Sequence, residues 1–166
     1  SNLDNVSEAG TPLTMETVDL LEVARECVER QKVNAKRSFI SLTYLGESAP
    51  VLGSRSLLDE LCQNLCDNAI RYNRPGGKVQ IITACTRDGH CSLTVKDNGI
   101  GIPKEAQSSV FERFYRVDKS RSKATGGTGL GLAIVKHIAR IHNARIKLES
   151  EIGEGTTITV LFETAH

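Results

Sequence analysis

The chain lacks the charge imbalance that marks proteins with a strongly charged partner. Its 166 residues include 21 lysines and arginines against 20 aspartates and glutamates, a formal net charge of +1. Such an even balance gives no case for nucleic acid or for a strongly acidic partner, because both select a basic surface. We therefore expect no nucleic-acid contact.

Long apolar runs are also missing. No stretch approaches the roughly 18 residues that a membrane-spanning helix needs, and we expect no signal peptide. Hydrophobic residues make up 39% and charged residues 25%, as in ordinary soluble domains. We expect a cytoplasmic domain without direct membrane contact.

Cysteines are few, and their number is odd. The five are Cys27, Cys62, Cys66, Cys85 and Cys91. An odd, scattered set is typical of a reducing compartment rather than of a disulfide framework. Cys62 and Cys66 lie four residues apart and could supply half of a metal site. No second pair stands at ligand spacing, so we expect these cysteines to pack in the core.

The length predicts one domain, because single domains cluster near about 100–150 residues. The chain opens Ser-Asn-Leu, so we expect residues 1–15 to be a linker with a tag remnant and 16–166 to be the domain. We find no repeat, and periodicity predicts helices over 17–32, 55–72 and 129–142 and strands over 39–44, 51–52, 79–83, 93–95, 145–151 and 156–163. Ser54 is a plausible N-cap, and Asp88-Gly89 favours a hairpin. Helices should cover one face of a mixed sheet.

An asparagine pair stands out on the second predicted helix. Asn64 and Asn68 lie four residues apart and point the same way, with Arg71 and Tyr72 one turn later. Asparagine is a mediocre helix former, so the pair calls for an explanation. Either the amides sit in water, or their carbonyl oxygens bind a hard cation such as Mg²⁺.

Two glycine-rich stretches are the strongest signals in the chain. Asp97-Asn98-Gly99-Ile100-Gly101 follows a predicted strand, and Asp97 either caps a turn or accepts a hydrogen bond from an exocyclic amino group. The latter would favour adenine over guanine by on the order of 1–3 kcal/mol. Gly126-Gly127-Thr128-Gly129-Leu130-Gly131-Leu132 precedes a helix, where it forms either a turn or an anion cradle. The lysine and arginine residues before this stretch belong either to a solvated loop or to a lid that closes over phosphates.

These motifs occur in one order together with Phe111-Glu112-Arg113-Phe114-Tyr115-Arg116. The order resembles the catalytic ATP-binding domain of bacterial sensor histidine kinases, over roughly residues 16–163. The resemblance implies an α/β, two-layer Bergerat-type sandwich, with a mixed, mostly antiparallel sheet covered on one face by helices. It also implies that residues 1–15 contain the end of a preceding dimerisation region.

The resemblance further implies that Mg·ATP binds between the asparagine helix and a mobile lid. Asn64 and Asn68 would hold Mg²⁺, and Asp97 would accept from the adenine amino group. Asn64 and Arg116 would be catalytic, with Arg116 reaching the γ-phosphate. The remaining nucleotide contacts would be Arg71, Tyr72, Gly99, Gly101, Ile102, Lys119, Gly127, Thr128, Gly129, Leu130, Gly131, Leu132 and Thr156, with Phe111 and Phe114 anchoring the lid.

Related ATPases such as DNA gyrase place a glutamate, as the base for water, where this chain has Asn64. An amide cannot accept that proton, which favours phosphoryl transfer over hydrolysis; Glu60 is predicted to be a surface residue. The histidines (His90, His137, His142 and His166) lack a following acidic residue, so we expect surface or interface roles and no self-phosphorylation. The usual His-Gly-Gly appears as His142-Asn143-Ala144, with Asn143 suited to a left-handed C-cap.

The expected function is therefore ATP-dependent phosphorylation of a histidine on dimerisation helices absent from this chain, followed by transfer to a response-regulator aspartate. A hydrolytic ATPase and a non-catalytic ATP-sensing module are the alternatives. We expect a homodimeric, membrane-anchored parent and a monomeric fragment.

Overall fold

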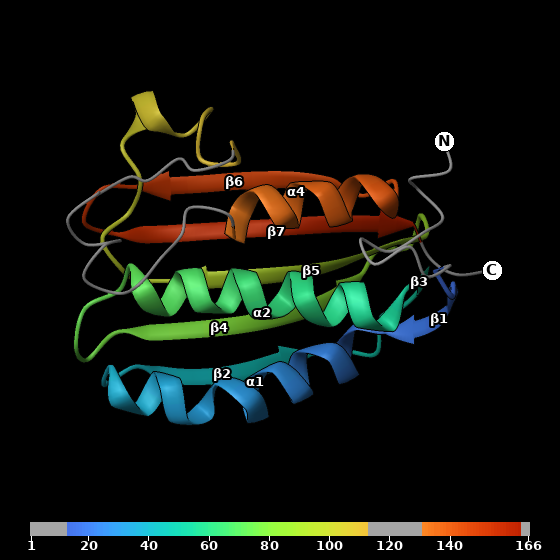
Figure 1. Ribbon diagram of the computed structural model, residues 1–166, viewed down its shortest axis with the longest axis horizontal. Helices are drawn as coiled ribbons and strands as arrows, with labels where there is room; N and C mark the ends of the chain where they lie inside the picture. The colour runs from blue at the N-terminus through green and yellow to red at the C-terminus, as the bar shows by residue number, and fades with distance from the viewer. Residues whose placement is uncertain (1–12, 113–130, 164–166) are drawn as a thin grey trace.

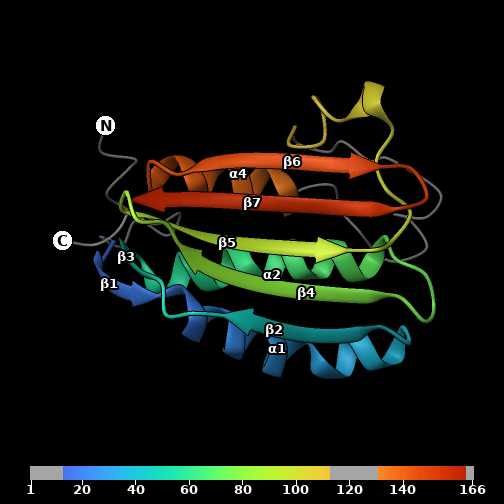
Figure 2. The same ribbon diagram turned by 180° about the vertical axis from the view of Figure 1, so that it is seen from behind.

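The computed structural model describes residues 13–112 and 131–163 of the chain. Within these ranges three helices, α1 (Leu20–Arg37), α2 (Arg55–Arg71) and α4 (Gly131–Ile141), lie on one face of a five-stranded sheet, as Figure 1 shows. In Figure 2 the strands lie in front of the helices. This layering confirms the predicted α/β sandwich with helices on one face. No helix among the described residues is both long enough and apolar enough to cross a membrane.

The sheet is mixed and mostly antiparallel. Its order is β2-β4-β5-β7-β6, and among these described strands only the β2–β4 pair is parallel. The register places Asp97, the last residue of β5, opposite Thr156 near the start of β7. The strands are β2 (Ser41–Gly46), β4 (Lys78–Cys85), β5 (His90–Asp97), β6 (Arg145–Glu151) and β7 (Gly155–Glu163).

An apolar core lies between the helices and the sheet. Alternate residues of β4 such as Val79 and Ile81 are fully buried, because successive side chains of a strand point to opposite faces. Leu65 of α2 and Phe162 of β7 are 2% exposed. The apolar face of the helices and the inward-pointing side chains of the strands therefore form one core layer, as the periodicity predicted.

The beginning of the chain differs from the prediction. The helix predicted from residue 17 begins at Leu20, because β1 (Glu16–Asp19) first pairs with β3 (Pro50–Gly53). Asp19 then caps α1: its Oδ1 accepts from the amides of Leu21 at 3.0 Å and Ala49 at 2.8 Å. The second partner lies far along the chain, so local periodicity did not indicate this boundary.

Helix α1 ends in an unusual way. Phe39 follows it with φ 58°, in the left-handed region, and its side chain is 72% exposed. The amides of Phe39 and Ile40 bond back to the carbonyls of Lys36 and Ala35, which closes the last turn. The strand predicted from residue 39 consequently begins at Ser41.

The other helix ends follow the prediction closely. Ser54 caps α2, and its hydroxyl accepts from the amide of Leu57 at 3.4 Å. After α4, Asn143 has φ 53°, and the amides of Asn143 and Ala144 bond back into the helix. The left-handed C-cap predicted at Asn143 is therefore confirmed. A short 3-10 helix, η2 (Lys104–Ala106), follows β5.

The β4–β5 hairpin contains a disulfide. Cys85 and Cys91 stand opposite each other in the register and are bonded. The expectation of cysteines without disulfides is therefore wrong for this pair, because hairpin pairing brings them together despite the odd total. The other three cysteines are free and buried, which agrees with the packing role predicted for Cys62 and Cys66.

Candidate nucleotide-binding site

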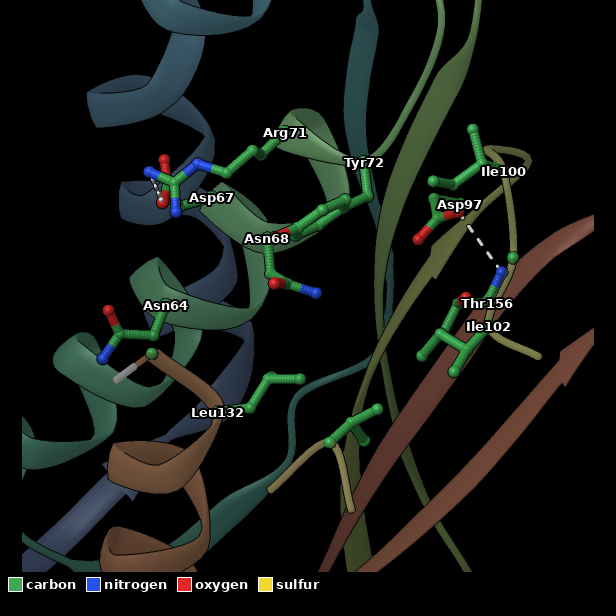
Figure 3. Close-up of a pocket in the computed structure, with 13 residues that line it drawn as sticks. Asn64, Asp67, Asn68, Arg71, Tyr72, Asp97, Ile100, Ile102, Leu132 and Thr156 are labelled. Carbon is green, nitrogen blue, oxygen red and sulfur yellow. Dashed lines mark hydrogen bonds and ion pairs between the residues drawn. The ribbon is translucent and has the colours of Figure 1, made fainter. Parts of the chain in front are cut away.

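A pocket opens between α2, the segment after β5 and the start of α4, and Figure 3 shows its lining residues. A concave site that combines apolar walls with a few convergent polar groups is typical of small-molecule binding. The cavity brings together ten residues predicted to contact the nucleotide: Asn64, Asn68, Arg71, Tyr72, Asp97, Gly101, Ile102, Gly131, Leu132 and Thr156. Residues from four separate parts of the sequence thus share one site.

Asp97 is held in place by backbone donors. Its Oδ1 accepts from the amide of Gly99 at 2.8 Å and from the amide of Thr156 at 3.2 Å. Burial raises the pKa of Asp97 to about 6, while these two backbone hydrogen bonds act in the opposite direction. One carboxylate oxygen is thus held by the protein, and no hydrogen bond to the other, Oδ2, is formed within the part of the chain that the structure describes.

The segment after Asp97 depends on glycine at two positions. Gly101 has φ +78°, and a Cβ there would overlap the carbonyl oxygen of Glu151. A Cβ on Gly99 would overlap the carbonyl oxygen of Tyr72. Gly99 does not line the cavity, although the sequence predicted a nucleotide contact; its amide instead orients Asp97.

Helix α2 contributes the polar wall of the cavity. The Nδ2 atom of Asn64 is buried and has no hydrogen-bond partner among the described residues. Buried polar groups are normally hydrogen-bonded in folded proteins, so this Nδ2 donor is a candidate partner for an acceptor oxygen of a ligand. Glu60, one turn earlier, is exposed, as predicted for a surface residue.

Arg71 forms an ion pair with Asp67 at 2.9 Å. Asp67, Ile100 and Val110 also line the cavity and were missed from sequence. Asp67 directly precedes Asn68 and stands four residues before Arg71, so the charge pattern of the helix could have revealed it. Ile100 and Val110 carried no signal, because isolated apolar residues look alike in loops.

The donor chemistry of the cavity suits a hard cation shared with a ligand. The described residues contain no cluster of three or more histidine, cysteine, aspartate or glutamate side chains that could hold a metal alone. Amide oxygens from Asn64 and Asn68 are ligands that Mg²⁺ accepts together with phosphate oxygens and water. The residues present therefore fit a magnesium ion that arrives with a phosphorylated ligand.

Several predicted contacts lie outside the described residues. They are Arg116, Lys119, Gly127, Thr128, Gly129 and Leu130, together with the lid residue Phe114. Their roles remain predictions.

The described histidines lie away from the cavity lining. His137 is exposed, as predicted, and His90 faces Asp88 at 3.6 Å. His142, expected in a surface or interface role, is half-buried, and both of its ring nitrogens contact backbone atoms. These partners come from the preceding turn and from the residue before α2, which the sequence did not indicate. His166 lies outside the described residues.

Comparisons with known proteins agree with the geometry. Residues 53–166 match the family described as histidine kinase-, DNA gyrase B-, and HSP90-like ATPase. The sensor-like histidine kinase SenX3 of Mycolicibacterium smegmatis is 49% identical over 150 residues, which are 88% of this chain. This chain spans only 38% of the length of that relative.

Solved structures show the same fold. The mycobacterial sensor histidine kinase MprB matches with a TM-score of 0.77 at 32% identity, over 90% of this chain and 97% of that one. Full-length ShkA in complex with AMPPNP matches with a TM-score of 0.78 at 25% identity, over 92% of this chain and 32% of that one. The chain therefore belongs to the histidine kinase-, DNA gyrase B-, and HSP90-like ATPase family, as an ATP-binding catalytic domain of the sensor histidine kinase type.

Proposed function

We propose that this domain binds ATP together with Mg²⁺ and delivers the γ-phosphoryl group to a histidine carried by another part of a longer sensor kinase. The observation that carries the proposal is the geometry of Asp97. Two backbone amides hold its Oδ1, which leaves Oδ2 to accept from the exocyclic amino group of adenine. Guanine would present an acceptor there and leave the carboxylate unpaired, which costs on the order of 1–3 kcal/mol.

The opposite side of the cavity suits the triphosphate. Asn64 and Asn68 would hold Mg²⁺, which neutralises charge on the phosphates during transfer. Gly131 begins α4 at the cavity, so the positive end of that helix faces the same space. Arg71 stands at this wall as a cation, and its ion pair with Asp67 orients it. Arg116, Lys119 and the glycines before residue 131 would complete the site from the lid.

Transfer fits the cavity better than hydrolysis does. The amide of Asn64 cannot act as a general base for water. Asp67, a carboxylate in the same wall, is occupied by Arg71. The acceptor is therefore a side chain from elsewhere, namely a histidine on dimerisation helices, from which the group passes to a response-regulator aspartate. On this proposal the parent is a membrane-anchored homodimer with this domain in the cytoplasm.

The test mixes labelled ATP, this chain and a separately made helical hairpin that carries a phosphoacceptor histidine. We expect acid-labile label on the hairpin and none on the domain. Steady release of free phosphate by the domain alone would favour the hydrolytic ATPase. Nucleotide binding with neither product would favour the sensing module.

The magnesium assignment has its own variant. Asn64→Ala should weaken nucleotide binding in the presence of Mg²⁺ by about tenfold and reduce the difference between binding with and without Mg²⁺, because one oxygen ligand is lost. The matched control is Gln63→Ala on the same helix, since Gln63 bonds to Gln31 of α1 and does not line the cavity. An unchanged metal dependence in Asn64→Ala would remove Asn64 from this role.

A further inference from the structure

His142 joins the end of α4 to the beginning of α2. Its Nε2 lies 3.0 Å from the backbone nitrogen of Ser54, and its Nδ1 lies 2.8 Å from the carbonyl oxygen of Ile138. The amide of Ser54 must donate, so Nε2 is an unprotonated acceptor. The carbonyl of Ile138 must accept, so Nδ1 carries the hydrogen. Both contacts are satisfied by one neutral tautomer only.

The surroundings of the ring are built for this close approach. A Cβ on Gly53 would lie 2.8 Å from Cδ2 and 2.9 Å from Nε2 of His142, so a side chain at residue 53 would displace the imidazole. The ring of Phe162 meets the imidazole edge-on, with centroids 6.1 Å apart. Ser54 is 3% exposed, so water cannot readily replace the imidazole as the partner of its amide.

This contact bears on the cavity through α4. Helices α2 and α4 lie side by side and run in opposite directions, as Figure 1 shows, so the end of α4 reaches the beginning of α2. The other end of α4 places Gly131 and Leu132 in the cavity lining. Because backbone hydrogen bonds make a short helix a stiff rod, a displacement at the His142 end of α4 is transmitted to the end that carries Gly131 and Leu132.

We propose that His142 is a positioning residue that locks α4 against the N-cap of α2 and thereby sets where Leu132 stands in the cavity. We call the contact of His142 with Ser54 the α4–α2 latch. Its effect on nucleotide affinity rests on the proposed ATP site, whereas its effect on Leu132 does not.

Protonation opens the latch. An imidazolium would place an N–H on Nε2 against the amide of Ser54, and two donors cannot bond to each other. The described groups recorded against the ring are Gly53 of β3, Ser54 at the N-cap of α2, Ile138 of α4 and Phe162 of β7, and none of these four ionises. Burial lowers the pKa of His142, and the bond to the carbonyl of Ile138 opposes this. The latch therefore stays closed at neutral pH and opens in acid.

The experiment uses three variants of the chain. His142→Phe keeps the bulk of the ring but removes both polar contacts; we expect the Leu132 methyl NMR signals to shift and the affinity for a fluorescent ATP analogue to fall about tenfold. His142→Gln offers an amide oxygen to Ser54 and should keep the affinity within about threefold of wild type. His137→Gln, on the exposed side of the same helix, is the control and should change neither readout.

The wild-type chain supplies a test that needs no variant. Nitrogen NMR of the His142 ring should show Nε2 unprotonated at neutral pH, and on acidification the Leu132 methyl signals should move with the same midpoint as the ring. His142→Gln should abolish that transition. A protonated Nε2, or Leu132 signals unaffected by His142→Phe, would overturn the latch. If neither the wild type nor any variant binds nucleotide, but the Leu132 methyl signals still change with the state of His142, the ATP proposal fails and the latch stands.

Discussion

At the scale of single residues, Asp97 combines two opposing demands. The folded chain buries its carboxyl group, which disfavours the charge, and then supplies two amides that favour it. The balance leaves the folded-state pKa at about 6, above the ordinary value of 3.8. A buried carboxylate with a raised pKa that lines a pocket is a candidate functional residue.

Asp97→Asn tests this balance through stability. Because the folded-state pKa is raised, the stability gained by protonation is present in full below pH 3.8 and is lost as the pH rises through about 6. The amide of the variant would keep an oxygen for the two backbone donors but could not ionise. We therefore expect the wild type to lose up to about 3 kcal/mol relative to the variant across this interval. Urea unfolding between pH 4 and pH 7 measures the difference, and parallel pH profiles of the two proteins would contradict it.

The same variant should bind ATP far more weakly. If its amide nitrogen faces the adenine amino group, two donors meet; if its oxygen does, the amide nitrogen is left unpaired against the backbone amides. The loss of binding without loss of apo stability at pH 7 is the expected combination. A variant that unfolds at pH 7 would instead make Asp97 a structural residue.

Much of the site was predictable at this scale, for a local reason. Asp97 and Gly101 stand in one short segment, and Asn64 and Asn68 share one helical face, so spacing alone indicated their association. The spacing of Asp67 and Arg71 was visible in the sequence, but Asp67 was missed because an acid–base pair four residues apart is common on helix surfaces. The bond from the Gly99 amide to Asp97 was not predicted, because it depends on the direction of one peptide group.

At the scale of elements, the ends of the helices matter more than their interiors. Both α1 and α4 are followed by a residue with positive φ, Phe39 after the first and Asn143 after the second. Asparagine adopts this conformation more often than most residues do, whereas a bulky residue such as phenylalanine rarely adopts it. The prediction therefore succeeded at Asn143 and failed at Phe39, where no residue type announces a left-handed turn.

Phe39→Gly should stabilise the domain by about 0.5–1 kcal/mol. A left-handed residue with a Cβ costs about 1–2 kcal/mol, part of which glycine returns as greater freedom in the unfolded chain. Little burial is lost, because the side chain is 72% exposed. Asn143→Gly is the matched control, and it should change the free energy of unfolding by only a few tenths of a kcal/mol. Urea unfolding of both variants gives the comparison, and a destabilised Phe39→Gly protein would contradict the argument.

At the scale of the whole molecule, one helix serves both the core and the cavity. Leu65 of α2 is 2% exposed in the core, while Asn64 and Asn68 beside it line the cavity. Helix α2 packs on the sheet, and the pairing of β5 with β7 brings Asp97 and Thr156 to the same site. The stability of the fold and the geometry of the site are therefore coupled through α2.

Leu65→Ala should lower the free energy of unfolding by about 2–5 kcal/mol, because it removes buried apolar atoms and leaves a cavity. Leu52→Ala on β3 is the control for the same chemical change at a 57% exposed position, and it should cost no more than about 0.5 kcal/mol. Thermal or urea unfolding of the two variants measures the contrast. Similar losses of unfolding free energy in both variants would mean that Leu65 contributes no more to the core than an exposed leucine does.

The sequence by itself determined the features that depend on neighbours along the chain. These include the Ser54 cap, the apolar face of α2, the β4–β5 hairpin and the two glycine-rich stretches that indicated a nucleotide site. Only the tertiary structure decided the Cys85–Cys91 bond, the capping of α1 by Asp19 with its link to Ala49, and the contact of His142 with Ser54, 88 residues away. The reason is physical: local periodicity reports which face of an element is apolar, but strand order and helix packing decide which distant backbone atom meets a given side chain.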